Sequence, residues 1–178
     1  GSKINLSCDC LGISGGWTPA VHLFTQSGGK LKFREEDQVF IPNTYPSDQI
    51  SIGSCNGDLS LEDILTNVPK TLKEFLNIKK TEYDNIEVLS SENRFKRNIW
   101  LIPSDKVLGK TKSFVDFQND ATAKDIKLAL REGFRSIEHV KRYTTTGMGT
   151  DQGKLGNMHA LGIISETAGT KMGEHWTT

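Results

Sequence analysis

Residues 114–154 read FVDFQNDATAKDIKLALREGFRSIEHVKRYTTTGMGTDQGK and predict two short helices between polar turns. Thr122 and Asp125 have the spacing of a capping box, in which a hydroxyl and a carboxylate each bind a free backbone N–H at the helix start. One apolar face follows at three- and four-residue steps, formed by Ile126, Ala129, Leu130 and Phe134. Gly133 is expected to end this helix, because glycine enters the left-handed backbone region without a steric cost.

The second helix is expected to begin after Ser136 and to end in a loop rich in threonine and glycine. Its inward residues are expected to be Ile137, Val140 and Tyr143, and its outward residues His139, Lys141 and Arg142. The loop contains Thr144–Thr146, Gly147 and Gly149, and Lys154 follows it. Many hydroxyl groups and free backbone N–H groups predict a loop that binds an anion. A loop that only packs against a neighbouring domain is an equally weighted alternative, since glycine also permits close backbone approach.

The composition is that of a loop-rich globular protein. Lys plus Arg and Asp plus Glu both number 22, so the whole chain lacks the basic surplus of a nucleic-acid-binding protein. We find no apolar run long enough to span a bilayer and no signal peptide, and therefore expect a cytoplasmic protein. Two of the three cysteines, Cys8 and Cys10, form a close pair, and Cys55 lies far from them in sequence. We interpret all three as free thiols rather than disulfides or zinc ligands.

The first third of the chain has the pattern of strands joined by tight turns. An apolar strand at Cys10–Ile13 runs into a turn that contains Gly15, Gly16 and Pro19. Such a turn at the carboxyl end of a strand is where open α/β sheets bind ligands. A turn of helix is expected around Val21 and Phe24.

Three further strands follow this helical turn. Residues 31–33 and 39–41 alternate as the two strands of a hairpin, and residues 50–52 form the next strand. This last strand leads directly into Gly53 and Ser54.

Residues 61–76 contain the most regular helical pattern in the chain. Ser60 and Asp63 form a second capping box. The apolar face consists of Leu61, Ile64, Leu65, Val68, Leu72, Phe75 and Leu76. Pro69 should bend or divide the helix, because proline removes an N–H donor and clashes with the preceding turn. We interpret the face as core packing rather than a partner groove.

Residues 77–113 are polar, and we place a domain boundary near residue 80. A strand is expected at Ile99–Ile102 and a weaker one at Ile86–Val88. A third helix is expected within residues 155–168, although Gly156 and Gly162 reduce its helix propensity. The predicted fold class is therefore α+β.

Three motifs carry a resemblance to a known family: GGWTPAVHLF at residues 15–24, FVDFQND at 114–120 and YTTTGM at 143–148. Over essentially its whole length the chain resembles the alpha subunit of heterotetrameric sarcosine oxidase. The resemblance implies an internal piece of a larger subunit. It implies that residues 1–80 are the C-terminal part of a FAD/NAD-type dinucleotide-binding domain. Residues 81–178 would be a small, mainly helical domain with a short strand region at 86–117.

The resemblance also implies a function. The family oxidatively demethylates sarcosine to glycine, using FAD, FMN, NAD and tetrahydrofolate, in a complex of alpha, beta, gamma and delta subunits. We expect this chain to be non-catalytic and inactive alone. The chain contains no G-x-G-x-x-G pyrophosphate loop, so alone it is expected to bind no cofactor. Gly53-Ser54 replaces the Gly-Asp pair of FAD-binding strands, which argues against FAD at that strand.

Residues 114–156 show a second, more distant resemblance, to the small helical [2Fe–2S] domain related to bacterioferritin-associated ferredoxin (BFD). That domain has two cysteines before its first helix and two after its second. The matching positions are Asp116, Gln118, Asp151 and Gly156. Because an iron–sulfur cluster requires thiolate or imidazole ligands, the resemblance implies a ferredoxin-like domain that has lost its cluster.

The candidate cofactor contacts come from the turns and loops described above. They are Gly15, Gly16, Pro19, Gly53, Ser54, Thr144, Thr145, Thr146, Gly147, Gly149 and Lys154. No catalytic and no metal-binding residue is predicted. The alternative function is an independent interaction module, for example one that binds nucleic acid through Arg131, Arg135, Lys141 and Arg142. Balanced charge and the lack of aromatic residues between these cations disfavour it.

Overall fold

The computed structural model describes residues 4–12, 15–46, 48–78, 98–104, 106 and 110–175. It is a mixed α and β structure, and its described strands form two small two-stranded sheets. The elements in chain order are α1 (His22–Gln26), β1 (Lys30–Arg34), β2 (Val39–Thr44), η1 (Gly53–Asn56), α2 (Leu61–Phe75), β3 (Phe114–Asp116), β4 (Ala121–Thr122), α3 (Ala123–Arg131), α4 (Ile137–Thr144), α5 (Gly156–Ala168) and η2 (Met172–Glu174).

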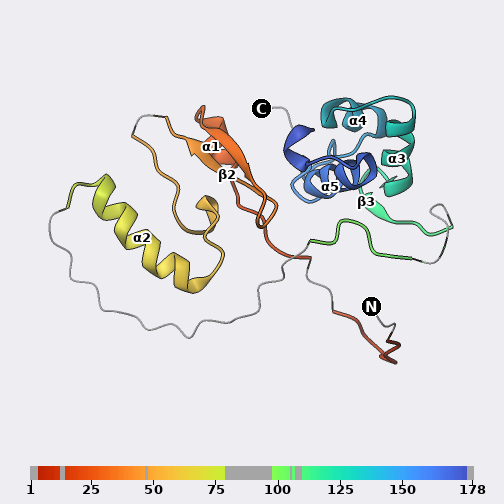
Figure 1. Cartoon of the computed structure of the whole chain (residues 1–178), viewed down its shortest axis with the longest axis horizontal. Helices are drawn as coiled ribbons and strands as arrows, with labels where there is room; N and C mark the ends of the chain where they lie inside the picture. The colour runs from red at the N-terminus through yellow and green to blue at the C-terminus, as the bar shows by residue number, and fades with distance from the viewer. Residues whose placement is uncertain are drawn as a thin grey trace.

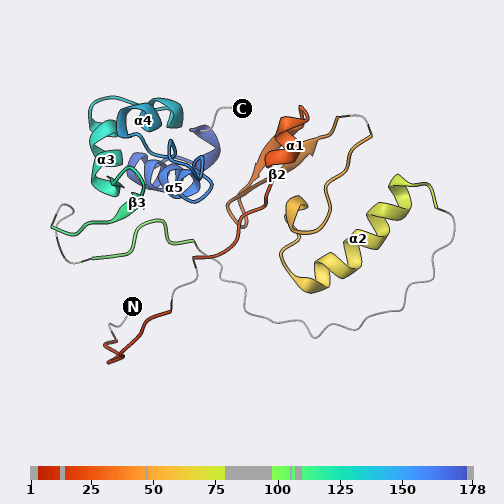
Figure 2. The same cartoon turned by 180° about the vertical axis from the view of Figure 1, so that it is seen from behind.

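The main hydrophobic core lies among α3, α4 and α5, which Figures 1 and 2 show gathered around one another. Ile126 of α3, Val140 of α4 and Ile164 of α5 are fully buried in it. The capping box is present as expected. Thr122 accepts the N–H of Asp125, and Asp125 accepts the N–H of Thr122 at 2.9 Å. Gly133 follows the end of α3 with a φ of 100°, which confirms its predicted role.

The β1–β2 hairpin packs against this helical core. The strands pair antiparallel, with Phe33 opposite Phe40 and their ring centroids 5.0 Å apart. Phe40 belongs to the same buried cluster as α3 and α5, and Leu31 packs against it. The predicted hairpin and the short helix α1 are thus confirmed.

Two glycines in α5 allow other segments to approach closely. A side chain at Gly162 would begin 2.2 Å from the Trp100 ring, and one at Gly156 would begin 2.9 Å from the carbonyl oxygen of Val115. Their low helix propensity is offset by this packing, so α5 forms as one uninterrupted helix.

Helix α2 packs against η1, and none of its residues is buried. Ser60 accepts the N–H of Asp63 at 3.0 Å, as the capping pattern predicted. Pro69 lies inside the helix without dividing it, because the flanking turns keep their helical backbone when one donor is missing. The expectation that its apolar face packs in a core is not met within the described residues.

Several other local expectations were wrong. Residues 50–52 and 99–102 form no strand, and neither do the described residues 10–12, because no strand among the described residues pairs with them. Tyr143 is 46% exposed and stacks on Phe134 at 4.9 Å instead of entering the core. The strand expected at 86–88 and the boundary near residue 80 lie outside the described residues, and the division into residues 1–80 and 81–178 stays a prediction.

Candidate functional site

The Asp116 carboxylate lies at the centre of the contacts between β3 and the Thr/Gly loop. Asp116 is only 7% exposed. Its Oδ2 accepts the N–H of Gly147 at 2.7 Å, and its Oδ1 accepts the N–H groups of Gln118 at 2.9 Å and Asn119 at 3.1 Å. The Asn119 side-chain amide adds a donor at 3.3 Å. A buried carboxylate therefore joins a loop that lies 31 residues further along the chain.

The hydrogen bonds around this carboxylate favour its charged form. Burial alone would raise the pKa of Asp116, because a low-dielectric environment disfavours the charge. The N–H donors from Gly147, Asn119 and Gln118 outweigh burial and hold the pKa below its ordinary value. One N–H of the loop, that of Gly147, thus donates to a carboxylate of the same protein, and binding of a ligand anion by the loop stays a prediction.

Two other side chains hold the same loop. Gln118 Oε1 accepts the backbone N–H of Thr150 at 2.5 Å and its hydroxyl at 2.9 Å. Asp151 accepts the N–H groups of Gly153 at 3.2 Å and Leu155 at 3.3 Å. Most of the loop N–H groups are thus already paired within the chain.

The threonine hydroxyls also bond within the loop. Thr144 Oγ1 donates to the Val140 carbonyl at 2.8 Å and lies 2.7 Å from Thr146 Oγ1. Thr145 Oγ1 donates to the Thr144 carbonyl at 2.6 Å, and Thr146 is fully buried. These contacts hold the loop in place. Thr144, Thr145 and Thr146 stay predicted cofactor contacts, although their hydroxyls already form hydrogen bonds within the chain.

The two loop glycines lie beneath side chains from other segments. A side chain at Gly147 would begin 2.1 Å from Asn157 Oδ1, and one at Gly149 would begin 2.3 Å from Gln118 Oε1. Both positions therefore need glycine for packing as well as for any ligand.

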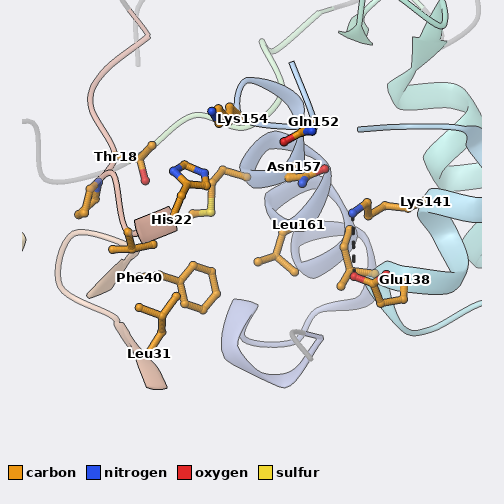
Figure 3. Close-up of a pocket in the computed structure, with 15 residues that line it drawn as sticks. Thr18, His22, Leu31, Phe40, Glu138, Lys141, Gln152, Lys154, Asn157 and Leu161 are labelled. Carbon is orange, nitrogen blue, oxygen red and sulfur yellow. Dashed lines mark ion pairs between the residues drawn. The ribbon is translucent and has the colours of Figure 1, made fainter. Parts of the chain in front are cut away.

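Two adjoining cavities lie between the N-terminal segment and the helical core, and Figure 3 shows the smaller one. The smaller has a volume of about 280 Å³ and the larger about 490 Å³. Thr18, Lys154 and Met158 line both. Volumes of this order are typical of small-molecule sites.

The cavities bring together predicted residues from distant parts of the chain. Gly15 and Gly16 line the larger cavity, Pro19 lines the smaller one, and Lys154 lines both. More than 130 residues separate Lys154 from the Gly15–Pro19 turn in sequence, so only the tertiary fold makes them neighbours.

The smaller cavity combines an apolar floor with a charged rim. Leu31, Phe40 and Leu161 form the apolar part in Figure 3. Lys141 and Glu138 pair across 4.0 Å at one side. Asn157 also lines it, and its buried Oδ1 has no hydrogen-bond partner.

The larger cavity is lined by aromatic side chains that were not predicted as site residues. The lining rings include Trp17, Trp100, Phe114 and Phe117, and His159 contacts Trp100 edge to face with centroids 5.8 Å apart. Gln38 and Asn98 also line it. Trp17, Phe114 and Phe117 lie in the motifs quoted above, but no local pattern marks them as lining one cavity, because the lining comes from five separate segments.

The remaining candidates lie elsewhere. Gly53 and Ser54 are in η1, where Gly53 is buried with a φ of 63°, and neither lines the two cavities. Arg131, Arg135 and Arg142 are exposed, whereas Lys141 is half-buried at the smaller cavity. All three cysteines are free and exposed.

The part of the chain that the structure describes contains no group of three or more His, Cys, Asp or Glu residues suited to a metal ion. Among those same residues, no helix has the length and apolar character needed to cross a membrane.

Comparison with known proteins shows which proteins this chain resembles. Residues 110–178 match the family described as Sarcosine oxidase A3 domain. The whole chain is 35% identical to the sarcosine oxidase subunit alpha of Rhizobium meliloti (strain 1021), of which it covers 18%. It is 31% identical, over 95% of its length, to the corresponding subunit of Corynebacterium sp. (strain P-1), again covering 18% of that protein.

A solved structure shares the fold. L-proline dehydrogenase from P. horikoshii superposes with a TM-score of 0.50 at 23% identity, covering 92% of this chain and 34% of the dehydrogenase chain. The chain spans about 18% of the length of the curated relatives it matches. Residues 110–178 therefore match the sarcosine oxidase A3 domain family, in a chain whose whole length is similar to one segment of sarcosine oxidase alpha subunits.

Proposed function

We propose that this chain is a non-catalytic, structural part of a sarcosine oxidase alpha subunit that also contacts a cofactor. The single observation that carries the structural role is the buried Asp116 carboxylate, which accepts the Gly147 N–H and ties the Thr/Gly loop to β3. A group used in this way stabilises the domain, and its lowered pKa makes it a poor proton acceptor at neutral pH.

The helical part corresponds in this proposal to a BFD-like ferredoxin domain without its cluster. Of the four positions matched to cysteines, Asp116, Gln118 and Asp151 each accept loop N–H groups. The fourth, Gly156, has no side chain, and a Cβ there would lie 4.0 Å from the Asp116 Cβ. Hydrogen-bond acceptors thus occupy the place where thiolates would hold iron, and oxygen acceptors are poor ligands for an iron–sulfur cluster.

An absorption spectrum with iron and sulfide analysis of the purified chain tests this assignment. We expect a colourless protein with neither iron nor acid-labile sulfide. Visible iron–sulfur absorption with stoichiometric iron would contradict it.

The proposed activity belongs to the assembled complex. There the family chemistry is oxidative demethylation of sarcosine to glycine, with FAD, FMN, NAD and tetrahydrofolate, in the cytoplasm. The proposed partners are the beta, gamma and delta subunits and the rest of the alpha subunit. In this assignment residues 1–80 continue a dinucleotide-binding domain whose pyrophosphate loop is supplied by the rest of the subunit.

Of the predicted contact residues, Lys154 is the one best placed to contact a cofactor. The hydroxyls of Thr144–Thr146 already bond within the loop, whereas Lys154 lines both cavities beside Gly15, Gly16 and Pro19. Lys154 would supply a cation to an anionic cofactor group, and the glycines would permit its close approach. Bound there, the cofactor would supply the redox chemistry.

Substitution in the intact complex tests the cofactor contact. We expect Lys154→Met to lower flavin content and turnover, and Thr145→Ser, which keeps the hydroxyl, to leave both unchanged. Normal flavin content and normal turnover in Lys154→Met would remove the proposed contact while leaving the structural role intact.

A further inference from the structure

Four large apolar side chains around the larger cavity are mostly exposed to solvent. They are Trp17, Ile99, Phe117 and Leu155, each between 65% and 83% exposed, and we call them the apolar rim. Single exposed apolar residues are common on protein surfaces. A group of them around one depression is instead typical of a surface that another polypeptide covers.

The walls of the cavity inside the apolar rim are packed within the chain. Trp100 lies against α5, where a side chain at Gly162 would begin 2.2 Å from its ring. His159 contacts the same ring edge to face. The rings of Phe114 and Phe117 have centroids 5.6 Å apart. A preformed depression of about 490 Å³ inside an exposed apolar rim is suited to receive one large side chain of an interface.

The charge of the lining narrows the kind of polypeptide that fits. Lys154 and His159 line the cavity, and no aspartate or glutamate is among the described residues that line it. A basic segment would lose the solvation of its charges there without gaining an acidic partner, whereas an apolar segment needs none. The surface therefore favours an apolar segment over a basic one.

The length of the related subunits indicates where such a segment comes from. The chain spans about 18% of the sarcosine oxidase alpha subunits that it matches, so most of their length lies outside the matched part. A segment of the same polypeptide has a high effective concentration at this surface, which favours its docking over that of a separate chain.

We propose that the apolar rim docks on a segment of the same alpha subunit outside residues 1–178, and that this segment inserts a large apolar side chain into the larger cavity. Trp17, Phe117 and Leu155 pack around the inserted side chain. The inference rests on the proposed place of this chain in an alpha subunit. It leaves the cofactor contact to Lys154 from the smaller cavity, which Lys154 also lines.

Photo-cross-linking in the intact complex tests the occupant of this surface. Residue 17 is replaced by the photoreactive Trp17→p-benzoylphenylalanine, and mass spectrometry identifies the cross-linked peptide. We expect a peptide of the same alpha subunit from outside this chain. The matched control is the same replacement at Leu23, which is 84% exposed and lines neither cavity.

Two results would overturn the proposed occupant. One is a principal cross-link from residue 17 to another subunit, and the other is a yield no higher than that from residue 23. The replacement Phe117→p-benzoylphenylalanine repeats the test on the opposite end of the sequence, and it decides the matter should the residue 17 variant not assemble.

Leu155→Asp tests whether the contact is apolar. Leu155 is the N-cap residue of α5, a position where aspartate is favoured, so the substitution should not destabilise that helix. A carboxylate inside an apolar contact is unfavourable, and we expect the cross-link yield from residue 17 to fall about tenfold. The control Leu23→Asp places a carboxylate in the first turn of α1 and should leave the yield unchanged. An unchanged yield in Leu155→Asp would overturn docking of the apolar rim.

Failure of this inference is distinguishable from failure of the proposed function. Assembly of the chain into a flavin-bearing complex without a cross-link from residue 17 or 117 would defeat the docking and leave the proposed function standing. Absence of the chain from any such complex would overturn both.

Discussion

Helices α2 and α3 begin with the same local signal and end in different environments. In each, a hydroxyl residue caps the helix by accepting the N–H of an aspartate three residues later, Ser60 with Asp63 and Thr122 with Asp125. In each, an isoleucine stands at the fourth helical position. Ile126 is fully buried, whereas α2 has no buried residue at all. A capped amphipathic pattern thus predicts a helix with a face to cover, and not the segment that covers it.

The largest difference between the two helices is expected for the matched substitutions Ile126→Ala and Ile64→Ala. Ile126→Ala removes a fully buried side chain and should lower the free energy of unfolding by about 2–5 kcal/mol. Ile64 is half-buried, so Ile64→Ala should cost roughly 1 kcal/mol or less. Urea unfolding followed by circular dichroism measures both, and equal losses would show that α2 is packed as tightly as α3.

A smaller loss is expected when the loop anchor is removed. Asp116→Ala leaves the buried N–H of Gly147 and two neighbouring donors without their acceptor, which should cost on the order of 2–3 kcal/mol. The control Asp120→Asn changes an exposed aspartate of the same turn and keeps a residue type that tolerates its φ of 51°. Both are compared by urea unfolding, and matching midpoints would mean that water replaces the carboxylate at no cost.

The two caps allow a finer comparison. Thr122→Ala and Ser60→Ala should each lower stability by about 1 kcal/mol where the helix is coupled to the core. Only α3 meets that condition among the described residues, so Thr122→Ala should lower the unfolding midpoint of the chain and Ser60→Ala should mainly increase local hydrogen exchange in α2. Local fraying confined to α3 would reverse the comparison.

The smallest expected effect is on how the stability of the folded chain depends on acid pH. Because the pKa of Asp116 is lowered in the folded chain, its contribution to stability is complete above the unfolded value of about 3.9 and is lost as the pH falls through the lower folded value. Asp116→Asn should abolish this part of the pH dependence. Unfolding midpoints measured between neutral pH and about pH 2 test it, and identical acid sensitivity in both proteins would assign the effect to other carboxylates.

The sequence predicted local features well where neighbouring residues decide them. The cap at Thr122, the stop at Gly133 and the hairpin of β1 and β2 are confirmed, since each depends on contacts within a few residues. The strand expected at residues 50–52 failed, because an apolar alternation forms a strand only where a partner strand is available.

The candidate site was predicted only in part. Glycine turns and a cation pointed to Gly15, Gly16, Pro19 and Lys154, which do lie along the two cavities. The aromatic rings and Gln38 were missed, since residues at 17, 38, 100 and 117 share no periodicity. Whether any of these positions contacts a cofactor stays a prediction.

Residues 114–154 determined by themselves where two helices start and stop, because caps and apolar spacing act over one or two turns. The similarity to sarcosine oxidase alpha subunits was also readable from their motifs. Only the tertiary structure decided which group the Gly147 N–H of the Thr/Gly loop meets. Long-range packing of β3 against α5 brings the Asp116 carboxylate to it. A separate long-range contact explains Gly162, because the Trp100 ring packs against this position of α5 only in the folded chain.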